Sequence, residues 1–271
     1  MTRSFDKDLS EPVAIPQEGI DRAVEIMESG RLFRYGEFAG ADSEVALLEK
    51  DFASYLGSNY AVAVNSGGAA MFIALKSAGV KPGDEVLVNA FTLAPVPGAI
   101  EHAGADPVFV ESDRNYRIDL EDLENKAAGP AKVLLLSHMR GHIADMERIQ
   151  DTCSRNGVML IEDCAHTLGA RFNGKLSGSF GRVACFSLQS FKHINAGEGG
   201  VLTTCDPDIA AQAILYSGSD MLYAQNGARP PLETFQKYRY RVPNFSMRMH
   251  EVTAAVARPQ LALLDSRREH W

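Results

Sequence analysis

The chain has 271 residues, of which 45% are hydrophobic and 23% charged, so it has enough apolar material for a buried core in one or two domains. Its formal net charge of −8 excludes the basic character that favours nucleic acids or anionic membranes. The first residues lack the apolar stretch of a secretory signal, and the longest aliphatic runs, such as 133–136, are too short to span a bilayer. We therefore expect a cytoplasmic protein that acts on small molecules.

The cysteines argue against disulfides and against a zinc site. Cys153, Cys164, Cys185 and Cys205 stand in apolar or helical contexts and lack the C-x-x-C spacing of a metal site. We expect four reduced, buried thiols, as is usual in the cytoplasm.

The expected elements alternate along most of the chain. A polar arm is followed by helices at 18–29 and 43–55, which end at Gly30 and Gly57. Short aliphatic runs then predict strands at 60–65, 85–89, 107–110, 132–137, 158–162, 182–187 and 200–204. Because these runs are apolar throughout, helices should cover both faces of the sheet. The fold class is therefore α/β, a three-layer α/β/α arrangement with a mainly parallel sheet.

Three segments carry polar groups where such a fold binds ligands. In the first, Asn-Ser-Gly-Gly-Ala-Ala at 65–70 precedes a helix expected at 71–77, and its free N–H groups suit a phosphate. In the second, Asp163 ends an apolar strand and His166 follows it, so that a carboxylate faces the ligand crevice. Read alone, the first segment is more simply a turn that needs glycine. The second is equally a polar strand end in which Asp163 caps the following residues and His166 is an ordinary hydrogen-bonded histidine.

The third segment places one lysine in an apolar, hydroxyl-bearing setting. Lys192 follows Phe-Ser-Leu-Gln-Ser-Phe and precedes the glycine-rich turn at 197–200. An amine shielded from water is deprotonated easily enough to form an imine. An isolated lysine is normally a solvated surface residue, and only the order of the three segments argues otherwise.

Taken together, NSGGAA, IEDCAHTLGA, FSLQSFKHINAGEGG and FSMRMHEVTAAVARPQL resemble the DegT/DnrJ/EryC1/StrS family of fold-type-I, pyridoxal phosphate (PLP)-dependent enzymes, chiefly sugar aminotransferases. The resemblance runs from about residue 30 to residue 264. It implies an N-terminal arm and helix at 1–30, a PLP-binding large domain at 31–248, and at 249–271 the start of a connecting helix. The smaller C-terminal domain of such enzymes is expected to be missing.

The same resemblance implies the roles of the central residues. Lys192 would be the Schiff-base lysine, Asp163 would pair with the pyridinium nitrogen, and His166 would lie beside the cofactor ring. The cofactor phosphate would be held by the N–H groups around Gly67, Gly68 and Ala69 and by the Ser187 hydroxyl.

Several positions depart from the family pattern. Gly68 stands where a threonine is usual, and Leu93 stands where an aromatic ring commonly stacks, which leaves aliphatic packing or Phe91 to replace it. Gln189 stands where many nucleotide-sugar enzymes have His or Tyr, and in this it is similar to relatives that act on cyclitols.

A further departure concerns the subunit contact. The family's N-x-R-M motif appears here as Ser246-Met-Arg-Met, so Ser246 or the nearby Asn244 is expected to reach the phosphate of a partner subunit. A homodimer is implied by the resemblance.

The function implied is transfer of an amino group from glutamate or glutamine to a keto-sugar, often nucleotide-linked, or to a keto-cyclitol, in secondary-metabolite or surface-polysaccharide biosynthesis. A PLP-dependent sugar dehydratase is a rival, but in the sugar 3-dehydratases of the family a histidine replaces the lysine. A non-catalytic or regulatory protein that retains the fold is the other alternative.

Two further motifs are decoys. The glycine-containing run 169–175 resembles a phosphate loop, but Leu176 stands where Mg²⁺ needs Ser or Thr, and a turn between two strands explains Phe-Asn-Gly-Lys better. His138 and His142 have the spacing of a zinc-binding helix, yet Met139 replaces the glutamate and Gly141 disfavours the helix. We expect no metal site.

Overall fold

The computed structural model describes residues 11–36 and 43–270 of the chain. The strands are β1 (Tyr60–Val64), β2 (Glu85–Asn89), β3 (Asp106–Val110), β4 (Val133–Ser137), β5 (Met159–Asp163), β6 (Arg171–Phe172), β7 (Lys175–Leu176), β8 (Val183–Ser187) and β9 (Gly200–Thr204). The helices are α1 (Gln17–Ser29), α2 (Glu44–Leu56), α3 (Gly67–Ser77), α4 (Pro95–His102), α5 (Leu120–Ala127), α6 (Met146–Asn156), α7 (Pro207–Ser217), α8 (Leu232–Phe235), α9 (Glu251–Ala262) and α10 (Leu264–His270). Two 3₁₀ turns are η2 (Met139–Gly141) and η3 (Tyr223–Gln225).

Seven of the strands form one sheet in the order β1-β9-β8-β5-β4-β2-β3. The pairs from β8 to β3 are parallel, whereas β9 runs antiparallel to both of its neighbours. The prediction of a mainly parallel sheet is confirmed, and each of the seven predicted strands agrees with the structure to within one residue at either end. The remaining strands, β6 and β7, form the predicted hairpin around Phe-Asn-Gly-Lys.

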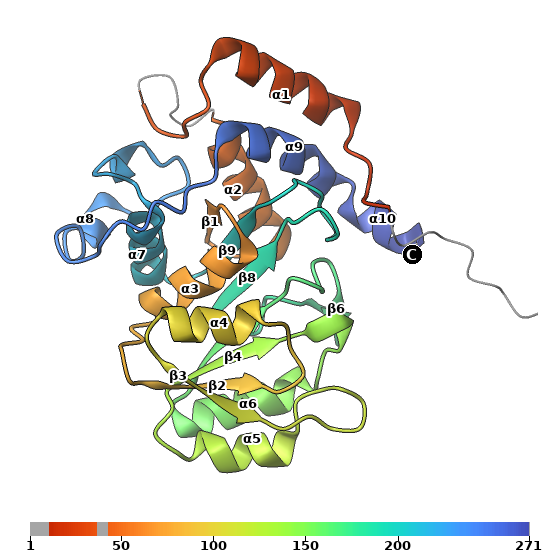
Figure 1. Cartoon of the computed structure of the whole chain (residues 1–271), viewed down its shortest axis with the longest axis vertical. Helices are drawn as coiled ribbons and strands as arrows, with labels where there is room; N and C mark the ends of the chain where they lie inside the picture. The colour runs from red at the N-terminus through yellow and green to blue at the C-terminus, as the bar shows by residue number, and fades with distance from the viewer. Residues whose placement is uncertain (1–10, 37–42, 271) are drawn as a thin grey trace, which may run out of the picture.

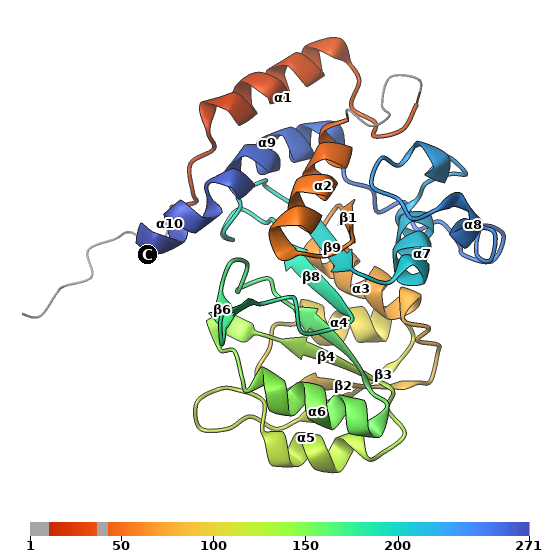
Figure 2. The same ribbon diagram turned by 180° about the vertical axis from the view of Figure 1, so that it is seen from behind.

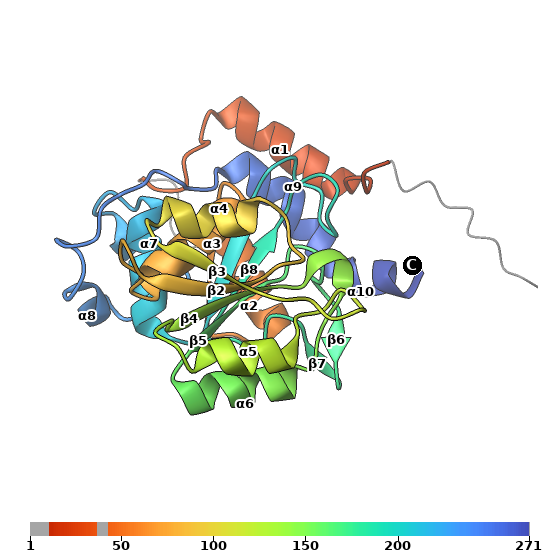
Figure 3. The same ribbon diagram turned by 60° about the horizontal axis from the view of Figure 1, so that its bottom comes forward.

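Successive side chains of the central strands face opposite layers, as the pleat requires. Val86 and Val88 of β2 pack in a core with α3, α4 and α7, whereas Leu87 packs in a second core with α5 and α6. Figure 3 shows these two helical layers on either side of the sheet. The predicted three-layer architecture is therefore confirmed.

A third core covers the β1 end of the sheet. Phe52 of α2 and Ala254 of α9 pack with Val201 of β9, on the side where α2 stands in front of the sheet in Figure 2. Helix α1 lies outside α9 and touches it through Ala23 and Ile26 (Figure 1). As predicted, α1 and α2 end at glycines, Gly30 and Gly57, both at a φ of 69°.

The predicted helical segment at the end of the chain is divided at Leu263 into α9 and α10. Pro259 lies inside α9. Within residues 11–36 and 43–270, we find no helix with the length and apolar character needed to cross a bilayer.

All four cysteines are free, and three of the predicted burials are confirmed. Burial raises the pKa of the Cys153 thiol to about 11 and raises the pKa of Cys164 and Cys185 as well, so these thiols stay protonated near neutral pH. The prediction for Cys205 was wrong. It is exposed because it follows the last residue of β9, in the turn that leads to α7.

Candidate active site

The predicted site residues meet at the carboxyl ends of the parallel strands. The loop after β1 leads into α3, the loop after β5 carries His166, and the loop after β8 carries Lys192. Because β5 and β8 are neighbours in the sheet, their loops emerge side by side. Open parallel sheets bind ligands at this edge.

Lys192 and His166 are in direct contact. The Lys192 Nζ lies 2.7 Å from the His166 Nε2. Burial lowers the pKa of Lys192, an effect that Asp163 opposes and Arg140 reinforces. Burial and the charge of Lys192 also lower the pKa of His166, so a neutral imidazole accepts a hydrogen bond from the amine. The site thus increases the fraction of neutral amine, the form that attacks an aldehyde.

Asp163 is held in place by its neighbours on the sheet. Its side chain is buried, the Ser137 hydroxyl donates to its Oδ2 at 2.8 Å, and the Ala165 N–H donates to its Oδ1 at 3.1 Å. Ser137 stands opposite Asp163 in the β4–β5 register and is itself fixed by Asn89, which exchanges hydrogen bonds with its backbone. A fixed, buried carboxylate of this kind suits a protonated ring nitrogen.

The start of α3 forms a cradle beside Ser187. Ser66 caps the helix, and its Oγ accepts from the Ala69 N–H at 3.0 Å. The Ala69 N–H, which was predicted to bind phosphate, is therefore already used within the chain. Gly67 and Gly68 occupy the first turn, where backbone N–H groups have no partner inside the helix. A Cβ on Gly67 would lie 2.9 Å from the Ser187 Cβ. The glycine therefore lets Ser187 lie closer to the start of α3 than any larger residue would allow.

The two glycines of this cradle provide a matched pair of variants. We expect Gly67→Ala to weaken the binding of PLP at least tenfold and to lower the free energy of unfolding by about 1–3 kcal/mol, because the new Cβ overpacks against Ser187. Gly68→Ala should leave both quantities nearly unchanged, since its Cβ would meet only the Ser66 Oγ at 3.8 Å. Absorbance titration with PLP and urea unfolding measure the two effects. Equal behaviour of the two variants would contradict this account of the cradle.

The other predicted residues are placed less centrally. Gln189 shapes the loop before Lys192, because its Oε1 accepts from the Phe191 N–H at 2.9 Å. Leu93 lies past the end of β2 and is 43% exposed. The nearby ring of Phe91 packs against Tyr116 and His142, with centroids 5.1 and 6.1 Å away.

Asn244 and Ser246 contact residues of their own chain. The Asn244 side chain is hydrogen-bonded to Asp220 and accepts from the Ser246 N–H, and the Ser246 hydroxyl accepts from Arg248. Backbone pairing of Met247 with Asn65 brings this segment to the end of β1. Their predicted contact with a partner subunit stays a prediction.

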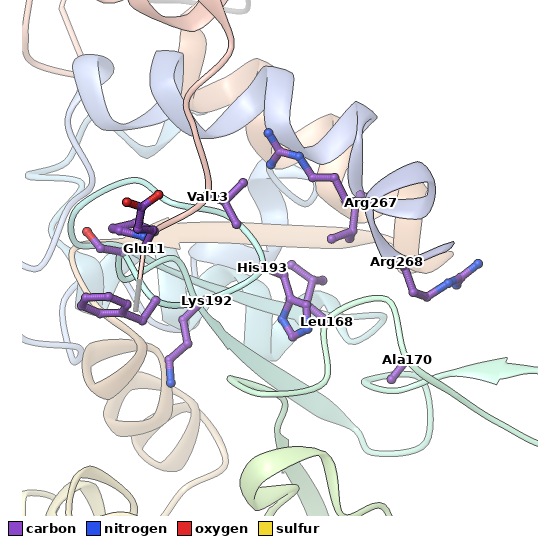
Figure 4. Close-up of a pocket in the computed structure, with 12 residues that line it drawn as sticks. Glu11, Val13, Leu168, Ala170, Lys192, His193, Arg267 and Arg268 are labelled. Carbon is purple, nitrogen blue, oxygen red and sulfur yellow. The ribbon is translucent and has the colours of Figure 1, made fainter. Parts of the chain in front are cut away.

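The apolar cavity behind the lysine loop is lined by the arm at 11–13, by the loop at 190–193 and by α10, with a volume of about 360 Å³. Figure 4 shows the Lys192 amine pointing away from Arg267 and Arg268, which line the other side. This apolar cavity therefore lies behind the reactive amine rather than in front of it.

Sequence reasoning missed four residues around the site. Ser137 hydrogen-bonds to Asp163, and Asn89 holds the backbone of Ser137. Glu162 accepts from the backbone of the turn before β8. The charge of Arg140 lowers the pKa of Lys192 and His166. The first two had a detectable signal, since each is a polar residue at the end of an otherwise apolar strand.

The histidines of the zinc-like motif, His138 and His142, lie close to Ser137 and Arg140 in the chain. His138 and His142 flank the 3₁₀ turn η2, so they do not share the helix face that such a motif requires. The ligand atoms of His138, Glu162 and Cys164 do lie within 4.8 Å of one another. However, the Glu162 carboxylate already accepts hydrogen bonds from His138 and from three backbone N–H groups. Its oxygens are therefore used to stabilise the fold.

These features define an α/β protein with a helix N-terminus suited to phosphate and a shielded lysine suited to imine formation. The chain belongs to the DegT/DnrJ/EryC1/StrS aminotransferase family, whose sequence model matches residues 14–270. This confirms the resemblance noted in the sequence.

Individual relatives agree with this membership. The chain is 34% identical over 246 residues to GDP-perosamine synthase of Caulobacter vibrioides, which covers 90% of this chain and 62% of the relative. It is 34% identical over 197 residues to L-glutamine:2-deoxy-scyllo-inosose aminotransferase of Streptomyces kanamyceticus, covering 72% of this chain and 46% of the relative. The solved structure of S. venezuelae DesV in complex with a ketimine intermediate superposes with a TM-score of 0.78 at 33% identity, covering 92% of this chain and 62% of that one.

The chain thus spans less than two thirds of the length of these relatives. The family and its solved members indicate pyridoxal phosphate as the cofactor. The residues present fit this group, because the free N–H groups in the first turn of α3, beside Ser187, suit its phosphate and the buried Asp163 suits its ring nitrogen. The Nδ1 of His166 is buried without a partner in the described chain, which is consistent with a ligand beside this ring.

Proposed function

We propose that this chain forms the cofactor-binding part of a PLP-dependent aminotransferase that moves an amino group from glutamate or glutamine to a keto-sugar or keto-cyclitol. One observation carries the proposal: the Lys192 amine, with a lowered pKa, lies 2.7 Å from His166 in a site that also contains the anchored carboxylate of Asp163. Family membership supports the reaction type. The names of two relatives, a perosamine synthase and a scyllo-inosose aminotransferase, support cyclic ketones as acceptors.

Each residue has a distinct task in this proposal. Pyridoxal phosphate, when bound, would supply an aldehyde for imine formation and a ring that accepts electrons from the substrate carbon. The Gly67 and Gly68 N–H groups and the Ser187 hydroxyl would hold its phosphate, and Asp163 would keep a proton on its ring nitrogen. Lys192 would form the imine and, once released from it, would move the proton from and to the substrate carbon.

His166 controls the state of the lysine. Its Nε2 accepts from the Lys192 amine and so holds Nζ in one position. Because its pKa is lowered by burial and by Lys192, the ring stays neutral near pH 7 and does not repel the ammonium form. We infer that His166 both orients the amine and lies against the cofactor ring.

The proposal includes a cytoplasmic homodimer with a shared active site. Its support is the family membership and the position of the segment of Asn244 and Ser246, which reaches the end of β1 next to the cradle. The apolar residues Ile20, Val24 and Met27 on the outer side of α1 are also exposed, each by more than 40%, as is common at a subunit contact.

Addition of PLP to the purified chain tests the proposed function. We expect a visible absorption band that borohydride converts into a stable product, with the added mass on the peptide that contains Lys192. L-glutamate or L-glutamine should then convert the untreated band to that of the amine form of the cofactor. Attachment at another lysine would contradict the assignment, and attachment without conversion by either amino acid would contradict aminotransferase activity in this chain.

A further inference from the structure

Arg140 emerges at the same edge of the sheet as the reactive lysine. The β4–β5 register pairs Ser137 with Asp163, and the turn η2 follows β4 directly. Arg140 therefore comes three residues after Ser137, just as His166 comes three residues after Asp163. The two loops leave neighbouring strands side by side, and His166 touches the Lys192 amine.

The backbone holds Arg140 in an unusual conformation. Its φ of 50° and ψ of 28° lie in the left-handed region, which is uncommon for a residue other than glycine. The turn is tied to β5 on its inner side, since the His138 N–H donates to the Asp163 carbonyl and the His138 ring contacts Glu162. Residues kept in this conformation by surrounding structure cluster at ligand sites.

Arg140 also places a positive charge beside the reacting groups. Its charge contributes to the lowered pKa of both Lys192 and His166. Among the described residues, no hydrogen bond or ion pair joins the Arg140 side chain to the protein. By contrast, Arg34 pairs with Glu49 and Arg248 with Asp220. An anionic ligand would offset the charge that Arg140 adds next to Lys192.

We propose that Arg140 binds the α-carboxylate of the amino-acid donor, an assignment that rests on the aminotransferase function proposed above. The group that Arg140 binds must lie close to the carbon that reacts at Lys192. In an amino acid the α-carboxylate is one bond from this carbon, whereas a keto-sugar has no charge next to its carbonyl. The planar guanidinium pairs with a carboxylate through two parallel hydrogen bonds. Arg140 is thus a specificity-determining residue for the donor.

Two amines that differ only in the α-carboxylate test this role. The PLP-loaded wild type, Arg140→Gln and Arg140→Lys are titrated with L-glutamate and with 4-aminobutyrate, and the change of the visible band is followed. We expect Arg140→Gln to raise the half-saturating concentration of L-glutamate roughly 10- to 100-fold, the loss of a charged hydrogen-bonded pair. Arg140→Lys should raise this concentration less than Arg140→Gln does. The response to 4-aminobutyrate should be the same in both variants as in the wild type.

The control is Arg155→Gln, which alters an exposed arginine on α6 that pairs with Asp151. It should behave as the wild type toward both amines. If wild-type protein forms no band that borohydride fixes, the proposed function itself fails. If the band forms but Arg140→Gln responds to L-glutamate as the wild type does, only the proposed role of Arg140 is wrong. The same holds if this variant responds more weakly to both amines by an equal factor. A loaded wild type that does not prefer L-glutamate over 4-aminobutyrate also overturns it.

Discussion

Replacement of Lys192 by alanine is expected to abolish the covalent attachment of PLP. No band should survive treatment with borohydride, and no peptide should carry the added mass, because the imine needs the Lys192 amine. Proton transfer by this amine would also be lost, which by itself lowers a rate roughly 10²- to 10⁴-fold. Absorbance and peptide mass spectrometry measure the outcome.

The fold should tolerate this change. The hydrogen bond of the Lys192 amine in the described chain goes to His166, and the side chain is only partly buried. We therefore expect the urea midpoint of Lys192→Ala to stay close to that of the wild type, so that loss of attachment reflects loss of the amine. Lys81→Ala, at an exposed lysine in the turn before β2, serves as the control and should attach PLP normally. Persistent attachment in Lys192→Ala would show that another lysine carries the cofactor.

Replacement of Glu162 by glutamine is expected to lower the free energy of unfolding by about 1–3 kcal/mol, the usual effect of leaving a buried polar group without a hydrogen-bond partner. The carboxylate is completely buried. Its Oε1 accepts from the N–H groups of Phe180 and Gly181 at 2.8 and 2.6 Å, and its Oε2 accepts from Gly178 at 3.0 Å and from His138 at 3.1 Å. Urea unfolding monitored by circular dichroism measures the loss.

Glutamine has nearly the same shape as glutamate, so the cause is polarity rather than packing. Its amide NH₂ would face a backbone N–H or the His138 ring and leave a buried donor without an acceptor. Glu124→Gln on α5 is the matched control, since that carboxylate is 41% exposed and its loss should change stability little. A loss below about 1 kcal/mol for Glu162→Gln would mean that the turn at 178–181 rearranges to satisfy its own N–H groups.

The hydrogen bonds of Glu162 matter for the active site because of the position of Glu162 in the chain. Glu162 precedes Asp163 on β5, and the turn that it holds leads directly into β8. This strand ends at Ser187, and the loop after it carries Lys192. Glu162 faces the opposite side of the sheet from Asp163, as alternate residues of a strand do. One strand therefore positions a ligand group on one side and anchors the next strand on the other.

The local signals in the sequence were sufficient for the strands and for the order of the site segments. Apolar runs predicted the seven strands of the main sheet to within one residue, because strands covered on both faces need apolar side chains throughout. Helix α3 was predicted to begin at residue 71 but begins at Gly67, because Ser66 caps it and two glycines occupy its first turn. Glycine disfavours a helix by propensity, and the cap outweighs that preference.

The amino-acid sequence by itself determined the sheet and the main candidates of the site, namely Lys192, Asp163, His166 and the glycines of the cradle, since these follow one another in short, recognisable segments. Only the tertiary structure decided which groups support them. Ser137 reaches Asp163 across 26 residues of sequence and Asn89 reaches Ser137 across 48, through strand register. Arg140 and Glu162 likewise owe their roles to neighbouring strands. Hydrogen bonds and charges act through distances in space, and folding alone brings such distant segments together.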